Sequence, residues 1–102
     1  MTEDIVMTVE ERAIVGRILA SHLPSGTRVC AFGSRTRGTK KRWADLDLSL
    51  EGPGPLSFEL MGRLADAFDE SLLPWKVDLV DRATVSETFG KIIDAHKVAL
   101  YP

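Results

Sequence analysis

The sequence predicts a small α/β (α+β) domain in which helices pack on one mixed β-sheet. Two observations lead to this fold class. Segments with apolar residues at helical spacing alternate with short segments in which polar and apolar residues alternate. The predicted order is helix, strand, loop, strand, helix, strand, helix. Pro and Gly residues separate these segments. The length of 102 residues suits a single domain, residues 1–102.

The N-terminal part is expected to contain one helix and one buried strand. A Thr-x-x-Glu capping box at residues 8–11 is followed by apolar residues at helical spacing, which predicts a helix over Val9–Leu23. Arg28–Phe32 is a short, mostly apolar run that stops at Gly33, as a buried strand does. The basic stretch Ser34–Trp43 shows no apolar period, so we expect a loop or short helix on the surface.

Two further strands and two further helices are expected in the remainder. Asp45–Leu50 and Lys76–Asp81 alternate polar and apolar residues, as strands with one face in the core do. Between them, an apolar stripe over Ser57–Glu70 predicts a helix. A second capping box, Thr84–Glu87, predicts a last helix. Its apolar residues are Val85, Phe89, Ile92 and Ile93.

Composition excludes several classes of function. The formal net charge is −2, from 13 basic and 15 acidic residues, whereas proteins that bind nucleic acid or anionic membranes carry a basic excess. Cys30 is the single cysteine, so no internal disulfide can form, and no Cys/His cluster has zinc-ligand spacing. The acidic N-terminus and the lack of a long apolar run predict a cytoplasmic protein without a signal peptide or membrane span.

Three aspartates are the candidate catalytic and metal-ligating residues. Asp45 and Asp47 lie two apart on a predicted strand, so both carboxylates point to the same face, and Asp78 has the same placement on the next strand. If these strands pair, the three like charges gather on one patch, where the protein must protonate one carboxylate, separate the carboxylates or place a cation between them. Oxygen ligands of high charge density select Mg²⁺, and two such ions can clamp a nucleotidyl transfer.

A turn after the first strand is the candidate nucleotide-binding segment. Gly33 tolerates a sharp backbone turn that a side chain would block. Ser34 then opens a segment whose free N–H groups and hydroxyl can hold phosphate oxygens. Arg35 and Arg37 add positive charge that suits a triphosphate. We therefore expect these residues to bind the phosphates of the nucleotide.

These motifs resemble those of the minimal nucleotidyltransferases (MNT proteins) of the DNA polymerase β superfamily. The resemblance covers nearly the whole chain and implies the polymerase β-like nucleotidyltransferase fold. Ala44 departs from the pattern, because many members carry Ser before the first aspartate. The matching segments are Gly33–Gly38, Asp45–Leu48 and Val77–Val80.

The resemblance also implies a role for each site residue. Asp45 and Asp47 would bind Mg²⁺ and hold the triphosphate of ATP. Asp78 would help to activate the acceptor hydroxyl, and Gly33 and Ser34 would form the phosphate-binding turn. With all three acidic positions filled, the sequence favours an active enzyme.

Short members of this family resemble antitoxins encoded beside a HEPN-domain toxin. The resemblance implies that such an antitoxin transfers AMP from ATP to a tyrosine of its toxin. Two alternatives remain open at this point. The acceptor could be a small molecule such as an aminoglycoside, or the protein could neutralise its partner by binding alone.

The remaining residues with chemical potential have simpler interpretations. Asp81, at the end of the third predicted strand, is interpreted as a turn or cap residue rather than a ligand. His22 and His96 lack a second ligand nearby in the sequence and are expected to be structural or exposed. Cys30 is expected to be an inert core residue. Trp75 could serve a partner interface or cover the sheet edge.

Overall fold

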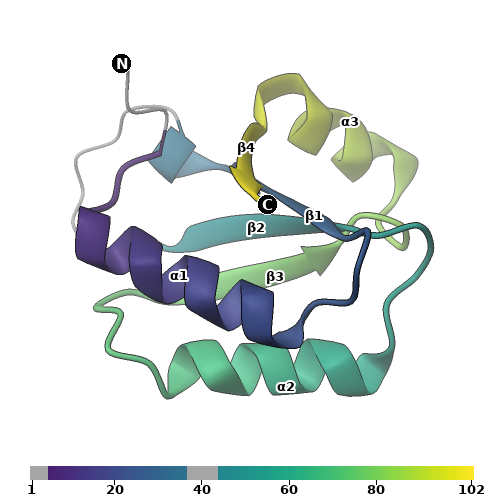
Figure 1. Cartoon of the computed structure of the whole chain (residues 1–102). Coiled ribbons are helices and arrows are strands. Elements are labelled where there is room, and N and C mark those ends of the chain that lie inside the picture. Colours follow the sequence, from purple (N-terminus) through teal and green to yellow (C-terminus); the bar gives the residue numbers. More distant parts are fainter. Residues whose placement is uncertain (1–4, 37–43) are drawn as a thin grey trace.

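A four-stranded mixed sheet with the strand order β3-β2-β1-β4 forms the centre of the computed structural model (Figure 1). β1 (Arg28–Phe32) pairs antiparallel with β2 (Leu46–Glu51) on one side and with β4 (Val98–Tyr101) on the other. β2 and β3 (Val77–Asp81) run parallel. This sheet confirms the fold class that the sequence predicts.

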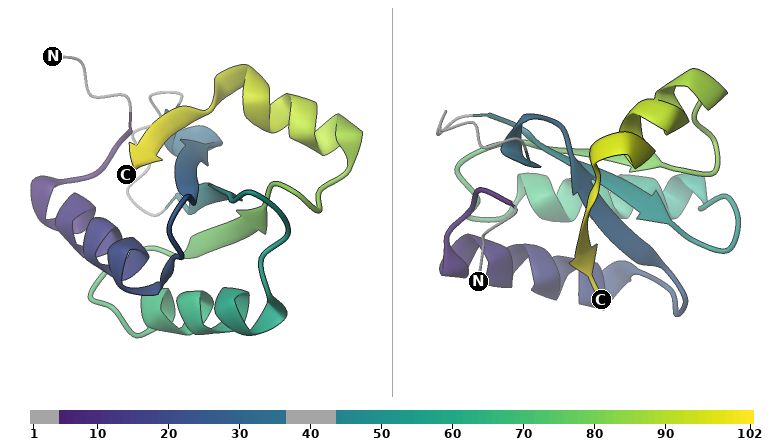
Figure 2. Two further views of the ribbon diagram at one scale, coloured as in Figure 1. Left: turned by 45° about the vertical axis from the view of Figure 1, so that its right-hand side comes forward. Right: turned by 90° about the horizontal axis from the view of Figure 1, so that it is seen from above.

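Three α-helices cover the sheet in the part of the chain that the structure describes, residues 5–36 and 44–102. α1 (Val9–His22) and α2 (Phe58–Asp69) lie on one face. α3 (Glu87–His96) lies on the opposite face, as the view from above in Figure 2 shows. None of the described helices has the length and apolar character needed to cross a membrane.

Polar caps set where the helices begin. The Thr8 capping box is present at the start of α1, and Ser57 caps α2, close to the predicted starts. The prediction for the start of the last helix was wrong by two residues, because Ser86 rather than Thr84 caps α3. Thr84 instead lies in the turn after β3, where its N–H donates to the Asp81 carbonyl at 3.0 Å. Val85 therefore precedes α3.

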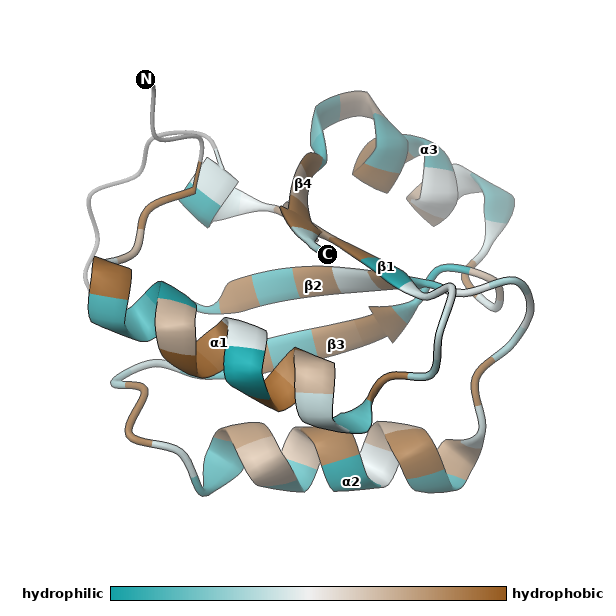
Figure 3. Cartoon of the chain, viewed as in Figure 1, coloured by the Kyte–Doolittle hydropathy of each residue, from teal (hydrophilic) through white to brown (hydrophobic). Residues whose placement is uncertain are grey.

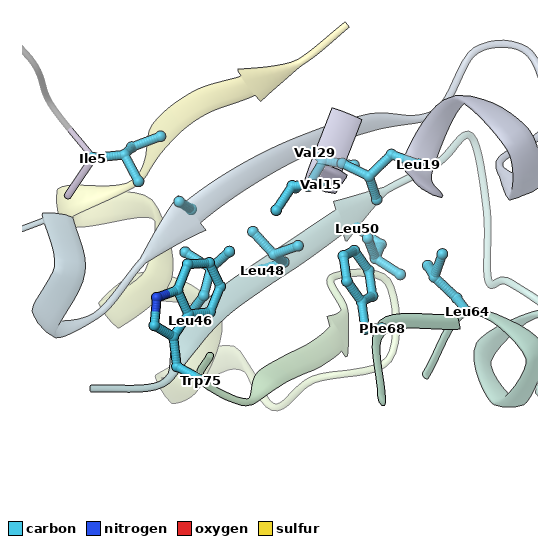
Figure 4. Packing of buried hydrophobic residues seen from close by; sticks show 11 residues of the cluster. Ile5, Val15, Leu19, Val29, Leu46, Leu48, Leu50, Leu64, Phe68 and Trp75 are labelled. Atoms are coloured by element: carbon cyan, nitrogen blue, oxygen red, sulfur yellow. The ribbon is translucent and has the colours of Figure 1, made fainter. Parts of the chain in front are cut away.

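The main core lies between the sheet and the pair α1 and α2. Leu46, Leu48 and Leu50 of β2 all point into it and are fully buried. Apolar side chains of both helices pack against them (Figure 4). Figure 3 shows polar and apolar residues alternating along β2, as expected for a strand with one face in the core. Because side chains alternate along a strand, the residues between these leucines face the other side of the sheet.

β4 was not predicted from the sequence. β4 has only four residues and begins directly after Lys97, the C-cap residue of α3. No Pro or Gly separates the helix from the strand. It pairs with β1, which lies about 70 residues earlier in the chain, so its strand form depends on this long-range pairing.

The packing around β2 leads to a test of the core. Leu48→Ala should lower the free energy of unfolding by about 2–5 kcal/mol, because it removes a fully buried side chain and leaves a cavity. Leu72→Ala is a matched control, since Leu72 is 90% exposed, and should change stability by less than about 0.5 kcal/mol. Urea denaturation measures both values. Similar losses in the two variants would contradict the assigned core.

Candidate active site

Three strand ends meet at one edge of the sheet. Phe32, the last residue of β1, pairs with Asp47 near the start of β2, and Asp47 pairs with Asp78 near the start of β3. Gly33 follows β1 directly. The structure therefore brings Gly33, Asp47 and Asp78 side by side, on the sheet face opposite to the leucine core.

Gly33 is required at this position for two independent reasons. Its φ is +83°, a conformation that L side chains rarely adopt. A Cβ atom here would also lie 2.2 Å from Oδ2 of Asp47, which is closer than atoms can approach. The Gly33 carbonyl accepts hydrogen bonds from the amide and hydroxyl of Thr36, at 3.1 and 2.7 Å, which closes the turn. The missing side chain thus makes room for the Asp47 carboxylate.

Asp47 has a carboxyl group whose pKa is shifted at this site. Its pKa is raised from the ordinary 3.8 to about 6. Burial is the largest cause, followed by the negative charges of Asp78 and Asp45 and by a side-chain hydrogen bond with Asp78. The described contacts of this carboxyl group therefore favour its protonated form, and a bound cation would reverse that preference.

Asp45 stands apart from this pair. It precedes β2 and is exposed, whereas Asp47 is half-buried. In the residues that the structure describes, no three carboxylate, His or Cys side chains already converge as a metal cluster. The donors nevertheless fit Mg²⁺, because they are all carboxylate oxygens and the charges of Asp45 and Asp78 both act on Asp47.

The predicted phosphate-binding residues have different placements. Ser34 is half-buried and opens the 3₁₀ helix η1 (Ser34–Thr36), directly after the Gly33 turn. Arg35 points into the protein instead of toward solvent, because its guanidinium stacks over the Trp75 ring and donates to backbone carbonyls. This placement differs from the predicted phosphate contact. Arg37 lies outside the described residues, as do Gly38 and the stretch Lys40–Trp43.

Comparison with known proteins places this fold in a family. Residues 13–100 match a family described as nucleotidyltransferase domain. The chain belongs to this family. It is 52% identical, over 84 residues, to the probable protein adenylyltransferase MntA of Haemophilus influenzae, covering 82% of this chain and 73% of the relative. The resemblance to minimal nucleotidyltransferases is thereby confirmed, and a nucleotide is the substrate type.

Solved structures show the same fold. A toxin–antitoxin crystal structure with AMP-PNP has a TM-score of 0.74 and 26% identity, and the match covers 92% of this chain and 73% of that one. A complex of tri-AMPylated Shewanella oneidensis HEPN toxin with its MNT antitoxin has a TM-score of 0.64 and 22% identity, over 93% of this chain and 72% of that one. At this identity the second likeness concerns the fold alone.

The sequence reasoning missed a hollow beside Asp45. It has a volume of about 350 Å³ and is lined by Asp45, Asp69, Trp75 and Lys76, with apolar side chains of α2 and the following loop. The signal available in the sequence was Trp75, three residues before Asp78.

The turn role predicted for Asp81 is confirmed, because its carboxylate accepts hydrogen bonds from the backbone N–H groups of Leu56 and Ala83 at 2.8 and 3.1 Å.

The raised pKa of Asp47 predicts how metal-free protein responds to pH. Between pH 3.8 and about 6 the folded state binds more protons at Asp47 than the unfolded chain does. The stability of the parent relative to Asp47→Asn should therefore fall as pH rises through this window. At pH 7 the variant should have the higher Tm. Thermal denaturation in the presence of a chelator measures this, and a Tm difference that stays constant from pH 4 to 7 would contradict it.

The Gly33 turn offers a second test with a close control. Gly33→Ala should abolish or strongly weaken binding of ATP with Mg²⁺, because the new Cβ collides with the Asp47 carboxylate. Gly26→Ala shares the backbone strain, with φ +88°, but its Cβ meets nothing within 4 Å. It should lower stability by roughly 1–3 kcal/mol and leave nucleotide affinity unchanged. Isothermal calorimetry compares the affinities. Unaltered binding by Gly33→Ala would contradict the assigned turn.

Proposed function

We propose that this chain is a Mg²⁺-dependent protein adenylyltransferase and an antitoxin. It transfers AMP from ATP to a hydroxyl group of a partner HEPN toxin, and tyrosine is the expected acceptor. The observation that carries the proposal is the pairing of Asp47 with Asp78 beside the Gly33 turn, with Asp45 flanking them. This is the arrangement that in-line nucleotidyl transfer requires, with a nucleotide-binding turn next to crowded carboxylates.

Each residue has a defined task in the proposed reaction. The backbone N–H groups after Gly33 and the Ser34 hydroxyl hold phosphate oxygens. Asp45, Asp47 and Asp78 are the residues that would hold Mg²⁺, which when bound offsets the negative charge of the triphosphate and of the departing pyrophosphate. Asp78, exposed at the start of β3, also accepts the proton of the acceptor hydroxyl. The acceptor oxygen bonds to the α-phosphorus as the bond to the β-phosphate breaks, and pyrophosphate leaves.

The proposed partner has two kinds of support. The 52% identical relative is named as a probable protein adenylyltransferase, which indicates a protein acceptor. The matching solved complexes are toxin–antitoxin pairs, one with AMP-PNP and one with a tri-AMPylated HEPN toxin. A protein acceptor also suits the open surroundings of Asp45 and Asp78, whose side chains are both exposed.

Co-expression with its HEPN protein should yield a partner heavier by one or more AMP units. Intact-mass spectrometry measures the mass, and tandem spectra should place each addition on a hydroxyl side chain, most often tyrosine. Asp45→Ala/Asp47→Ala should abolish the shift, since the triphosphate charge is then no longer offset. Asp66→Ala/Glu70→Ala, which instead removes an exposed acid of α2 and the exposed acid at its C-cap, should leave it intact.

Growth rescue separates modification from binding. If modification is the mechanism, the Asp45→Ala/Asp47→Ala variant should fail to relieve toxicity while still being folded and expressed. Protection by this variant, with an unmodified partner, would show that the chain neutralises its partner by contact alone. A mass shift on a small molecule and none on the partner would reject the protein acceptor.

A further inference from the structure

Arg35 is a buried cation next to the nucleotide-binding turn. Its exposed fraction is only 3%, although arginine is seldom fully buried without partners. It lies in η1, two residues after Gly33 and one after Ser34. A long charged side chain that turns inward at this point needs a structural reason.

The contacts of Arg35 join segments that are distant in the sequence. Its Nε donates to the Ala44 carbonyl at 2.8 Å, and its Nη1 donates to the Val6 carbonyl. Its Cζ lies 4.2 Å from the centroid of the Trp75 ring. The Arg35 carbonyl in turn accepts the Val6 amide at 3.0 Å. The guanidinium therefore fixes the entries to α1, β2 and β3 at once.

Each of these segments leads directly to a site residue. Ala44 immediately precedes Asp45. Trp75 precedes Lys76, whose carbonyl accepts the Leu46 amide at 2.9 Å just before β3 runs on to Asp78. Arg35 itself follows Ser34. One side chain thus links the nucleotide-binding turn with the backbone that carries the carboxylates.

The charge of Arg35 is compatible with this buried position. Burial lowers its pKa, while the negative charges of Glu11 and Asp45 raise it. Arginine stays protonated even so, and its planar fork can donate in two directions while its face stacks on an aromatic ring. A lysine could keep the charge but could not reproduce this set of contacts.

We propose that Arg35 is a positioning residue, which holds Asp45 at a fixed distance from the Gly33–Ser34 turn without touching the nucleotide. The inference rests on the nucleotidyl transfer proposed above. It replaces the phosphate-binding role that the sequence suggested for Arg35. A misplacement of about 1 Å in a catalytic group can lower the rate by about 100-fold. Loss of the Arg35 contacts should therefore affect kcat more than nucleotide affinity.

The test compares Arg35→Met, Arg35→Lys and Arg63→Met, the last being the same change at an exposed position on α2. In AMP transfer to the toxin, we expect kcat to fall about 10-fold to 100-fold in both Arg35 variants, with KM for ATP changed less than about 3-fold. Arg63→Met should match the parent. Arg35→Lys should not restore kcat, because lysine keeps the positive charge but lacks the planar guanidinium group.

Two results would overturn the proposal. Recovery of parental activity by Arg35→Lys, together with a raised KM in Arg35→Met, would identify Arg35 as a phosphate ligand. An unchanged kcat with a lowered Tm would show that Arg35 serves stability alone. If Arg35→Met does not fold, Trp75→Phe takes its place, since it weakens the stacking on Arg35 and keeps an aromatic ring in the core. kcat should then fall several-fold, and a parental kcat would overturn the proposal.

Hydrogen exchange distinguishes this inference from the proposed function. The Val6 and Leu46 amides are bonded within the segments that Arg35 joins, whereas the Arg82 amide bonds Leu50 at the opposite edge of the sheet. Arg35→Lys should speed exchange at Val6 and Leu46 and leave Arg82 unchanged. This measurement needs no toxin. If the parent protein showed no transfer activity, the proposed function would be rejected, but the positioning role of Arg35 would still be tested by exchange. Equal exchange in the parent and Arg35→Lys would reject the positioning role.

Discussion

Repulsion between carboxylates at one edge of the sheet is the constraint on which the rest of the site depends. Asp47 is paired in register with Asp78, and Asp45 lies close enough to add its charge. Such crowding is unfavourable for a free protein and becomes favourable when a cation and a polyphosphate are present. The raised pKa of Asp47 and the side chain missing at Gly33 are both consequences of packing a carboxylate into this place.

At the opposite edge of the sheet, the carboxylates are paired with cations. There Asp94 of α3 bonds Arg82 at 2.8 Å and Lys97 at 3.0 Å, and Lys97 also bonds Glu51 at the end of β2. The hydrogen bonds from Arg82 and Lys97 hold the pKa of Asp94 well below its usual range. At one edge cations accompany the acids, and at the other the acids face each other, so the pKa values move in opposite directions.

Most of the fold could be predicted from the sequence because local signals and final structure agree. The caps at Thr8 and Ser57 mark where helices begin, and the alternation over Asp45–Leu50 marks both a strand and its carboxylate face. Arg35 could not be predicted in this way. The charge of Arg35 indicates a surface position. The ring on which its guanidinium packs belongs to Trp75, 40 residues later in the chain. Long-range contacts decide such positions, and local patterns cannot show them.

The site exists because the sheet is mixed. Parallel strands begin at the same edge, so the α2 crossover brings the start of β3 beside the start of β2 and places Asp78 next to Asp47. β1 runs the other way and ends at that edge, which supplies the Gly33 turn. An antiparallel β3 over the same residues would put Asp78 opposite Ser49 instead of Asp47, about 7 Å further along β2 at ~3.3 Å per residue. The helix that joins two parallel strands therefore determines whether these acids can lie side by side.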